Sequence, residues 1–185
     1  MIAFKGFTKD LTARLGNGIF QYEIGQTYTE ESAKCANTGF HCVEEPIRVL
    51  SWYGCPEDRY CQVEVDKDVH EDGKDKIAAS RIRIIKELNR IQLATMECKW
   101  LMEHPKRKYS TWVQEKKAAI NGIAIARGKK PQAKGTIGDY LFLLQEYVNR
   151  PDIKRFEVYI VDGEKIKANT YINIAGKEIE DDSKG

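Results

Sequence analysis

The sequence lacks a long apolar run and an excess of charge of either sign. Its 185 residues include 30 basic and 28 acidic side chains, which gives a formal net charge of +2. No stretch approaches the roughly 18–20 apolar residues of a membrane-spanning helix, and residues 1–6 carry no export signal. We therefore expect a globular protein of the cytoplasm with no membrane partner. The balanced charge also argues against nucleic acid as a partner, because binding along phosphates needs local positive excess.

Cysteine is present in an odd number, which does not suit a disulfide framework in a chain without an export signal. The five residues are Cys35, Cys42, Cys55, Cys61 and Cys98. Four of them lie near His41, but structural zinc ligands come in pairs about two to four residues apart, and these gaps are longer. We predict no metal site, and we expect Cys42 and Cys61 to be small buried residues.

Common catalytic signatures are also absent. The sequence contains no phosphate-binding loop, no zinc-protease motif and no serine-hydrolase elbow. The residues therefore favour binding over catalysis, with no cofactor.

The spacing of apolar residues predicts an α+β fold in two parts. Period-two alternation and helical spacing indicate a mixed N-terminal α/β domain over residues 1–104, followed by a linker over 105–117. The predicted strands of this domain are residues 2–7, 20–24, 40–43, 59–65 and 77–85, and the predicted helices are 46–53 and 86–104.

A small β-rich module is expected over residues 118–182, followed by a polar tail at 183–185. Small residues alternate with apolar ones over 118–128, and the glycines there disfavour a helix. Such a pattern is typical of tight β-rungs, because small inward residues let backbones stack closely. We expect this module to support self-association into a homo-oligomer.

Several segments resemble an uncharacterised family of phage and prophage proteins. The similar segments are residues 3–7, 21–25, 39–42 and 59–64 near the start, and 133–135 and 161–167 near the end. The N-terminal domain of that family has no known function. Longer members carry Ala/Gly-rich repeats similar to adhesin heads, followed by a short C-terminal β module. In this sequence the repeats are reduced to residues 118–128.

A looser resemblance links the N-terminal domain to compact ADP-ribosyltransferase-like domains. It implies a basic residue followed by glycine, aromatic side chains that clamp nicotinamide, and a later acidic residue, with NAD as the cofactor. Lys5 and Gly6 stand at the first position, although lysine lacks the planar fork of arginine. The candidate ligand-binding cleft comprises Lys5, Tyr22, His41, Tyr53, Arg59 and Glu64.

A basic cluster follows the second predicted helix. Lys106, Arg107 and Lys108 precede Tyr109, so one interpretation is a phosphate or nucleic-acid contact with a stacking neighbour. The interpretation that we favour is a solvated linker whose charges complement the C-terminus of the helix.

Taken with the family resemblance, the residues predict a phage-encoded accessory protein of the host cytoplasm that acts by binding. It would antagonise a host defence system, either by blocking an effector protein or by sequestering a nucleotide signal. Two alternatives stay open: an ADP-ribosyltransferase-like enzyme that uses NAD, and a minor structural protein of the virion.

Overall fold

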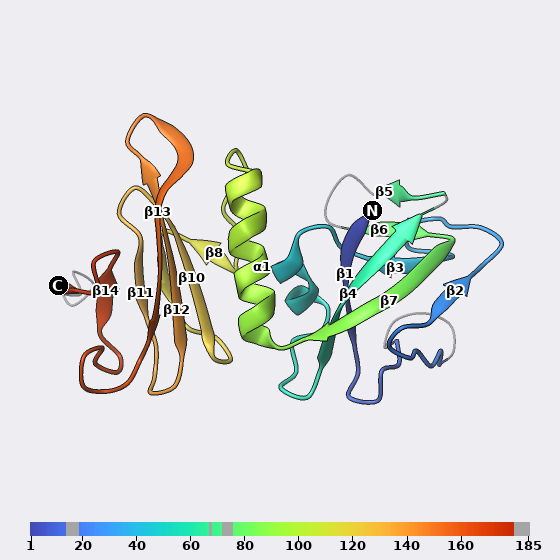
Figure 1. Cartoon of the computed structure of the whole chain (residues 1–185), viewed down its shortest axis with the longest axis horizontal. Helices are drawn as coiled ribbons and strands as arrows, with labels where there is room; N and C mark the ends of the chain where they lie inside the picture. Colours follow the sequence, from blue (N-terminus) through green and yellow to red (C-terminus); the bar gives the residue numbers. More distant parts are fainter. Residues whose placement is uncertain (14–18, 67, 72–75, 180–185) are drawn as a thin grey trace. The chain divides into compact units, whose positions relative to one another are not determined.

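The computed structural model describes residues 1–13, 19–66, 68–71 and 76–179. The chain divides into two compact units, Met1–Leu93 and Ala94–Gly185 (Figure 1). Both contain mostly β-strands with few helices, which agrees with the α+β class at a coarse level. The division falls inside the second predicted helix rather than after it, and the predicted tail at 183–185 lies outside the described residues.

The N-terminal unit contains two antiparallel sheets and a short 3-10 helix. The larger sheet has the order β1 (Ile2–Phe7), β4 (Arg59–Asp66), β7 (Arg81–Leu88), β2 (Thr27–Thr29). The smaller sheet has the order β3 (Phe40–Cys42), β6 (Ile77–Ala79), β5 (His70–Glu71). The helix, η1, spans Pro46–Ser51 and begins at a proline, which suits the first turn because proline has no amide hydrogen to satisfy.

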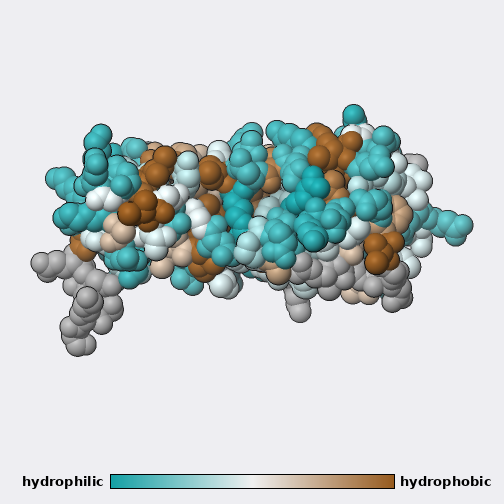
Figure 2. Space-filling view, turned by 90° about the horizontal axis from the view of Figure 1, so that it is seen from below, coloured by the Kyte–Doolittle hydropathy of each residue, from teal (hydrophilic) through white to brown (hydrophobic). Residues whose placement is uncertain are grey.

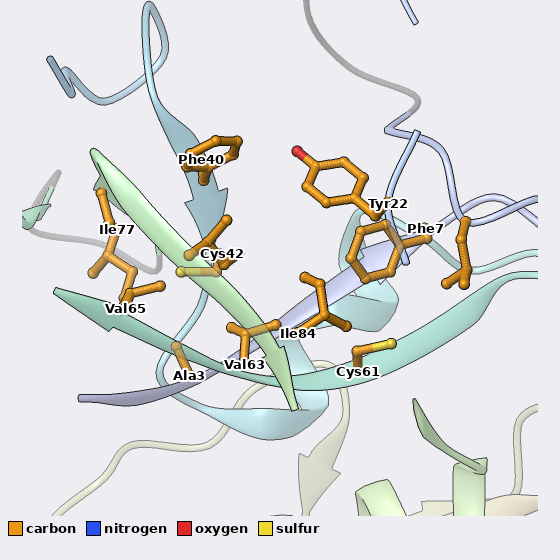
Figure 3. Close-up of a cluster of buried hydrophobic side chains, with 13 residues drawn as sticks. Ala3, Phe7, Tyr22, Phe40, Cys42, Cys61, Val63, Val65, Ile77 and Ile84 are labelled. Atoms are coloured by element: carbon orange, nitrogen blue, oxygen red, sulfur yellow. The ribbon is translucent and has the colours of Figure 1, made fainter. Parts of the chain in front are cut away.

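The core of this unit is formed by apolar side chains from both sheets (Figure 3). Alternation along β4 places Cys61, Val63 and Val65 on the core face, and each of these side chains is fully buried. Cys42 is buried in the same core. The predicted burial of Cys42 and Cys61 is confirmed, and every cysteine of the chain is a free thiol.

The strand predicted over residues 20–24 is wrong. Gln21 forms only an isolated bridge to Thr12, and the strand of this region is β2, further along the chain. The alternating residues are instead an aromatic cluster: Tyr22 lies 4.7 Å from Phe20 and 5.3 Å from Tyr28, measured between ring centroids. Aromatic packing in an irregular segment therefore produced the period-two pattern.

The helix predicted over residues 86–104 begins later than expected. Residues 86–88 belong to β7, and α1 spans Arg90–Glu103. The Asn89 side chain accepts a hydrogen bond from the Gln92 amide at 2.8 Å, and the Gln92 side chain accepts one from the Asn89 amide at 2.9 Å. This reciprocal capping box fixes the start of the helix.

The C-terminal unit contains two four-stranded sheets. One has the order β13 (Arg150–Ile160), β12 (Tyr140–Tyr147), β10 (Ile123–Gly128), β8 (Val113–Gln114). The other has the order β15 (Glu178–Ile179), β14 (Tyr171–Asn173), β11 (Gln132–Lys134), β9 (Lys116–Ala118). From β8 to β12 the chain alternates between the sheets, and successive strands within each sheet are parallel. This alternation is the connectivity of stacked β-rungs.

Small side chains occupy the space between these sheets. Ala124, Ala126 and Ala133 are almost fully buried against Leu141 and Leu143. The segment predicted as a linker, 105–117, contains β8 and the first residues of β9, so the β structure begins earlier than expected. Short strands of two or three residues give too little alternation to be recognised from sequence.

The surface is mainly hydrophilic. On the face drawn in Figure 2, hydrophobic residues lie in separate small patches among polar ones. Among the described residues, no helix has both the length and the apolar character needed to cross a membrane.

Candidate ligand-binding pocket

A cavity of about 320 Å³ lies within the N-terminal unit. It is bounded by β1, by β3 and the turn before it, and by η1 with the residues that follow. The lining residues that carry the argument are Lys5, Tyr22, His41, Trp52, Tyr53 and Lys76. The volume is at the lower end of the range of small-molecule sites, roughly 300–1,000 Å³. None of the described lining residues is acidic.

Four of the six residues of the predicted cleft line this cavity. Lys5, Tyr22, His41 and Tyr53 come from separate segments and meet there. Their role in ligand binding stays a prediction.

The other two predicted residues lie elsewhere. The Arg59 guanidinium donates to both carboxylate oxygens of Glu87 on the neighbouring strand, at 2.8 and 2.7 Å. Glu64 lies on β4 opposite Ile2 and Arg83, and it alternates with the core residues of that strand, so its side chain points to the opposite face. Neither Arg59 nor Glu64 lines the cavity.

Lys5 is the buried cation of the pocket. Alternation along β1 places it with Ala3 and Phe7 on the face that packs against the core. Its side chain is only 6% exposed, and Nζ donates a hydrogen bond to the His41 carbonyl oxygen at 2.8 Å. The ammonium also lies 5.6 Å from the Phe7 ring centroid and 5.5 Å from that of Tyr22. Such contacts stabilise a cation modestly, by about 0.5–2 kcal/mol.

Burial lowers the pKa of Lys5 to about 8, although nearby Cys42 and Glu30 act in the opposite direction. The ammonium form therefore still predominates at pH 7. An ammonium has three N–H donors. Among the described residues, the His41 carbonyl is the hydrogen-bond acceptor recorded for Lys5, and no carboxylate forms an ion pair with it. The described residues therefore provide a hydrogen-bond acceptor for one of its three donors.

His41 is held as a neutral ring. Its Nε2 accepts a hydrogen bond from the Ala36 amide at 2.9 Å, so the proton of the neutral ring lies on Nδ1. Burial lowers the pKa of His41, and nearby Lys5 and Lys76 lower it further. The adjacent Cys42 stays a thiol, because burial raises its pKa to about 12. This pair therefore does not supply an activated nucleophile.

Aromatic rings form the remaining walls. Gly6 leaves room for the Tyr53 ring, since a Cβ atom at position 6 would clash with Tyr53 Cδ2. Burial raises the pKa of Tyr22, so its phenol keeps the proton. Trp52 is 39% exposed, and Lys76 Nζ lies 3.6 Å from its ring centroid. The sequence reasoning missed Trp52 and Lys76, because no spacing links residues that meet only through the fold.

The structure also bears on whether the described residues could hold a metal ion. Within the described parts of the chain, no three His, Cys, Asp or Glu side chains are placed to hold a metal ion.

The predicted basic cluster lies in the C-terminal unit, outside the pocket. Its backbone is fixed by Arg127, which donates to the Arg107 carbonyl at 3.0 Å and also to the Pro105 carbonyl. The Arg107 guanidinium lies 5.8 Å from the Trp100 ring centroid. Exposed side chains at the surface here are Lys106, Lys108 and Tyr109.

Comparison with known proteins identifies the N-terminal half. A family model described as "Domain of unknown function (DUF7666)" matches residues 1–96, which is more than half of the chain. The chain belongs to the DUF7666 family. The matched region contains all the residues that line the pocket. No curated protein and no solved structure matches the chain.

Proposed function

We propose that the DUF7666 domain of this chain acts by binding, and that its pocket takes a small anion that carries an aromatic or apolar group, such as a nucleotide. The observation that carries this proposal is the Lys5 ammonium, which is buried beside a cavity without a carboxylate partner among the described residues. Burying an isolated charge is costly, and a ligand anion would compensate that cost.

The walls support the same ligand class. Tyr22, Trp52 and Tyr53 present aromatic surface on which a planar group can stack. Lys76 adds a second positive charge near the exposed Trp52. The described lining contains no acidic side chain, and the nearby carboxylate of Glu30 accepts a hydrogen bond from the amide of Gly39, a lining residue.

The alternative function is enzymatic: an ADP-ribosyltransferase-like enzyme that uses NAD. That chemistry needs an acidic residue beside the bound nicotinamide, and the predicted Glu64 lies outside the cavity. A second alternative is a minor structural protein of the virion, and the β-rungs of the C-terminal unit support it. We place binding first because the described lining contains two lysines and several aromatic rings, but no acidic residue and no activated nucleophile.

The biological setting that we propose is a phage-encoded protein of the host cytoplasm that sequesters a nucleotide signal of host defence. Its support is the family resemblance together with the positive, aromatic pocket. Blocking of an effector protein is the second mode, and it would use the surface of the domain rather than the pocket.

Calorimetry and thermal shift with mononucleotides, cyclic nucleotides and dinucleotides test the proposal. We expect one nucleotide class to bind, and Lys5→Met to weaken its affinity at least ~30-fold, since losing one partner of a buried charge pair costs about 2 kcal/mol or more. Lys117→Met is the matched control: Lys117 is also buried, but it donates to the Thr111 carbonyl in the other unit. Equal affinity of both variants for the ligand would refute the role of Lys5.

A further inference from the structure

Among the strands that the structure describes, β13 has a neighbour on one side only. It is 11 residues long, and in the described sheet it pairs with β12 alone. The unpaired amide and carbonyl groups of an edge strand can pair with another chain. Proteins commonly prevent this with charged side chains, proline or a bulge at the edge.

Charged side chains occur in both halves of β13, with Glu157 in the second, but proline and the register shifts are confined to the first half. Pro151 and Lys154 lie there, opposite the register shifts that involve Gln145, Glu146 and Tyr147 of β12. From Phe156 to Ile160 the pairing with β12 is regular. The second half is therefore the part of the edge that is free to extend the sheet.

The backbone of this second half presents its even-numbered residues to the open side. Both backbone groups of Val161 bond the segment just before β12. Its amide donates to the Asp139 carbonyl at 3.0 Å, and its carbonyl accepts from the Gly138 amide at 2.8 Å. In an antiparallel pair these groups alternate from one side of the strand to the other. The amides and carbonyls of Phe156, Val158 and Ile160 consequently point away from β12.

The side chains of the same three residues share one face, and that face is apolar. Val158 is 42% exposed and Ile160 is 49% exposed, whereas Tyr159 on the other face packs against the core between the sheets. Phe156 is half-buried. An open edge and an exposed apolar stripe thus coincide over five residues.

We infer that two copies of this chain pair antiparallel along β13, with a two-fold axis at Val158. In this register Val158 meets its own copy and Phe156 meets Ile160 in both directions, so three apolar pairs form on one face. Lys154 then opposes Asp162, which is a pair of opposite charges. A register centred on Phe156 would instead place Val158 opposite Lys154 and Ile160 opposite Asp152. Two of the three apolar residues would then face a charged side chain, and their apolar pairs would be lost.

The partner is a second copy because the segment is complementary to itself under two-fold rotation. The paired segment is short compared with a standard interface of ~1,600 Å². We therefore expect an association that depends on concentration. This inference does not rest on the pocket or its ligand.

Disulfide trapping in the full chain tests the register. Directly opposed residues in a hydrogen-bonded pair have Cα atoms about 5.5 Å apart, within the span of a disulfide. Under oxidising conditions we expect Val158→Cys to give a covalent dimer, at least tenfold more than wild type. Phe156→Cys alone should give no excess, whereas a mixture of Phe156→Cys and Ile160→Cys chains should cross-link.

Light scattering gives an independent measurement. Wild type should shift from monomer to dimer as concentration rises, and Val158→Lys should stay monomeric. Val148→Lys is the matched control, because Val148 is 74% exposed in the hairpin outside the paired segment. The inference is overturned if wild type is monomeric at its highest soluble concentration, if Val158→Lys still dimerises, or if Phe156→Cys cross-links to itself while Val158→Cys does not.

Discussion

Replacing Lys5 by methionine should stabilise the ligand-free protein. Methionine has a similar length and no charge, so it fills the same space beside Phe7 and Tyr22. Burial lowers the pKa of Lys5 from 10.5 to about 8, and each tenfold change in proton affinity corresponds to about 1.4 kcal/mol. The folded state therefore bears a cost of about 3 kcal/mol for keeping this ammonium protonated.

The substitution also removes a hydrogen bond. Lys5 Nζ donates to the His41 carbonyl at 2.8 Å, and methionine leaves that acceptor without this donor. Loss of such a partner costs about 1–3 kcal/mol. At pH 7 the difference between these two terms predicts a net gain in the free energy of unfolding of about 0–2 kcal/mol for Lys5→Met.

The gain should depend on pH with a defined sign. The folded-state pKa of Lys5 is below its unfolded value, so between about pH 8 and 10.5 the unfolded state binds more protons and wild type gains stability as pH rises. The advantage of Lys5→Met should therefore be greatest below about pH 8 and should shrink as the pH rises from 8 to 10.5. Urea unfolding from pH 6 to 10.5 measures this. A difference between the two proteins that does not change with pH would refute the argument.

Three further outcomes are expected. Affinity for an anionic ligand should fall by up to about tenfold per pH unit above pH 8 as Lys5 loses its proton, which calorimetry measures. Gly6→Ala should cost about 1–3 kcal/mol in chemical denaturation and weaken ligand binding, because the new methyl group would displace the Tyr53 ring. Arg127→Met should destabilise the chain by about 3–5 kcal/mol, because it leaves the carboxylate of Glu146, which is 12% exposed, without its partner at 2.8 Å.

The sequence predicted those parts of the fold in which local pattern and packing agree. The strand over residues 2–7 is confirmed as β1, and alternation identified the core face of β4. The small residues of 118–128 predicted close strand stacking, and β10 does pair in parallel with β8 and β12. In each case the same residues set both the local conformation and the buried face.

The errors arose where a local signal was overlooked or had another cause. The reciprocal bonds of Asn89 and Gln92 mark the start of α1, and the spacing of these two residues was available in the sequence. The aromatic cluster around Tyr22, by contrast, imitates a strand, and only the tertiary contacts distinguish the two. The site was predictable only in part, because some of its residues meet only in the folded chain: Lys76, which precedes β6, lies against the ring of Trp52, which follows η1.

A comparison of two buried cations, Arg127 and Lys5, suggests that Lys5 serves ligand binding rather than the stability of the fold. Arg127 is 2% exposed, but Glu146 and two carbonyl groups satisfy its guanidinium, so its charge is compensated within the fold. Lys5 is nearly as buried, yet among the described residues its ammonium donates to a single carbonyl. An apolar side chain at that position of β1 would give a higher free energy of unfolding, since burying it carries no cost of desolvating a charge. Glu30 raises the pKa of Lys5 but forms no ion pair with it, so within the described residues the fold compensates this charge less fully than that of Arg127. Together with a described lining that has no acidic residue, this is the ground on which we propose an anion as the ligand.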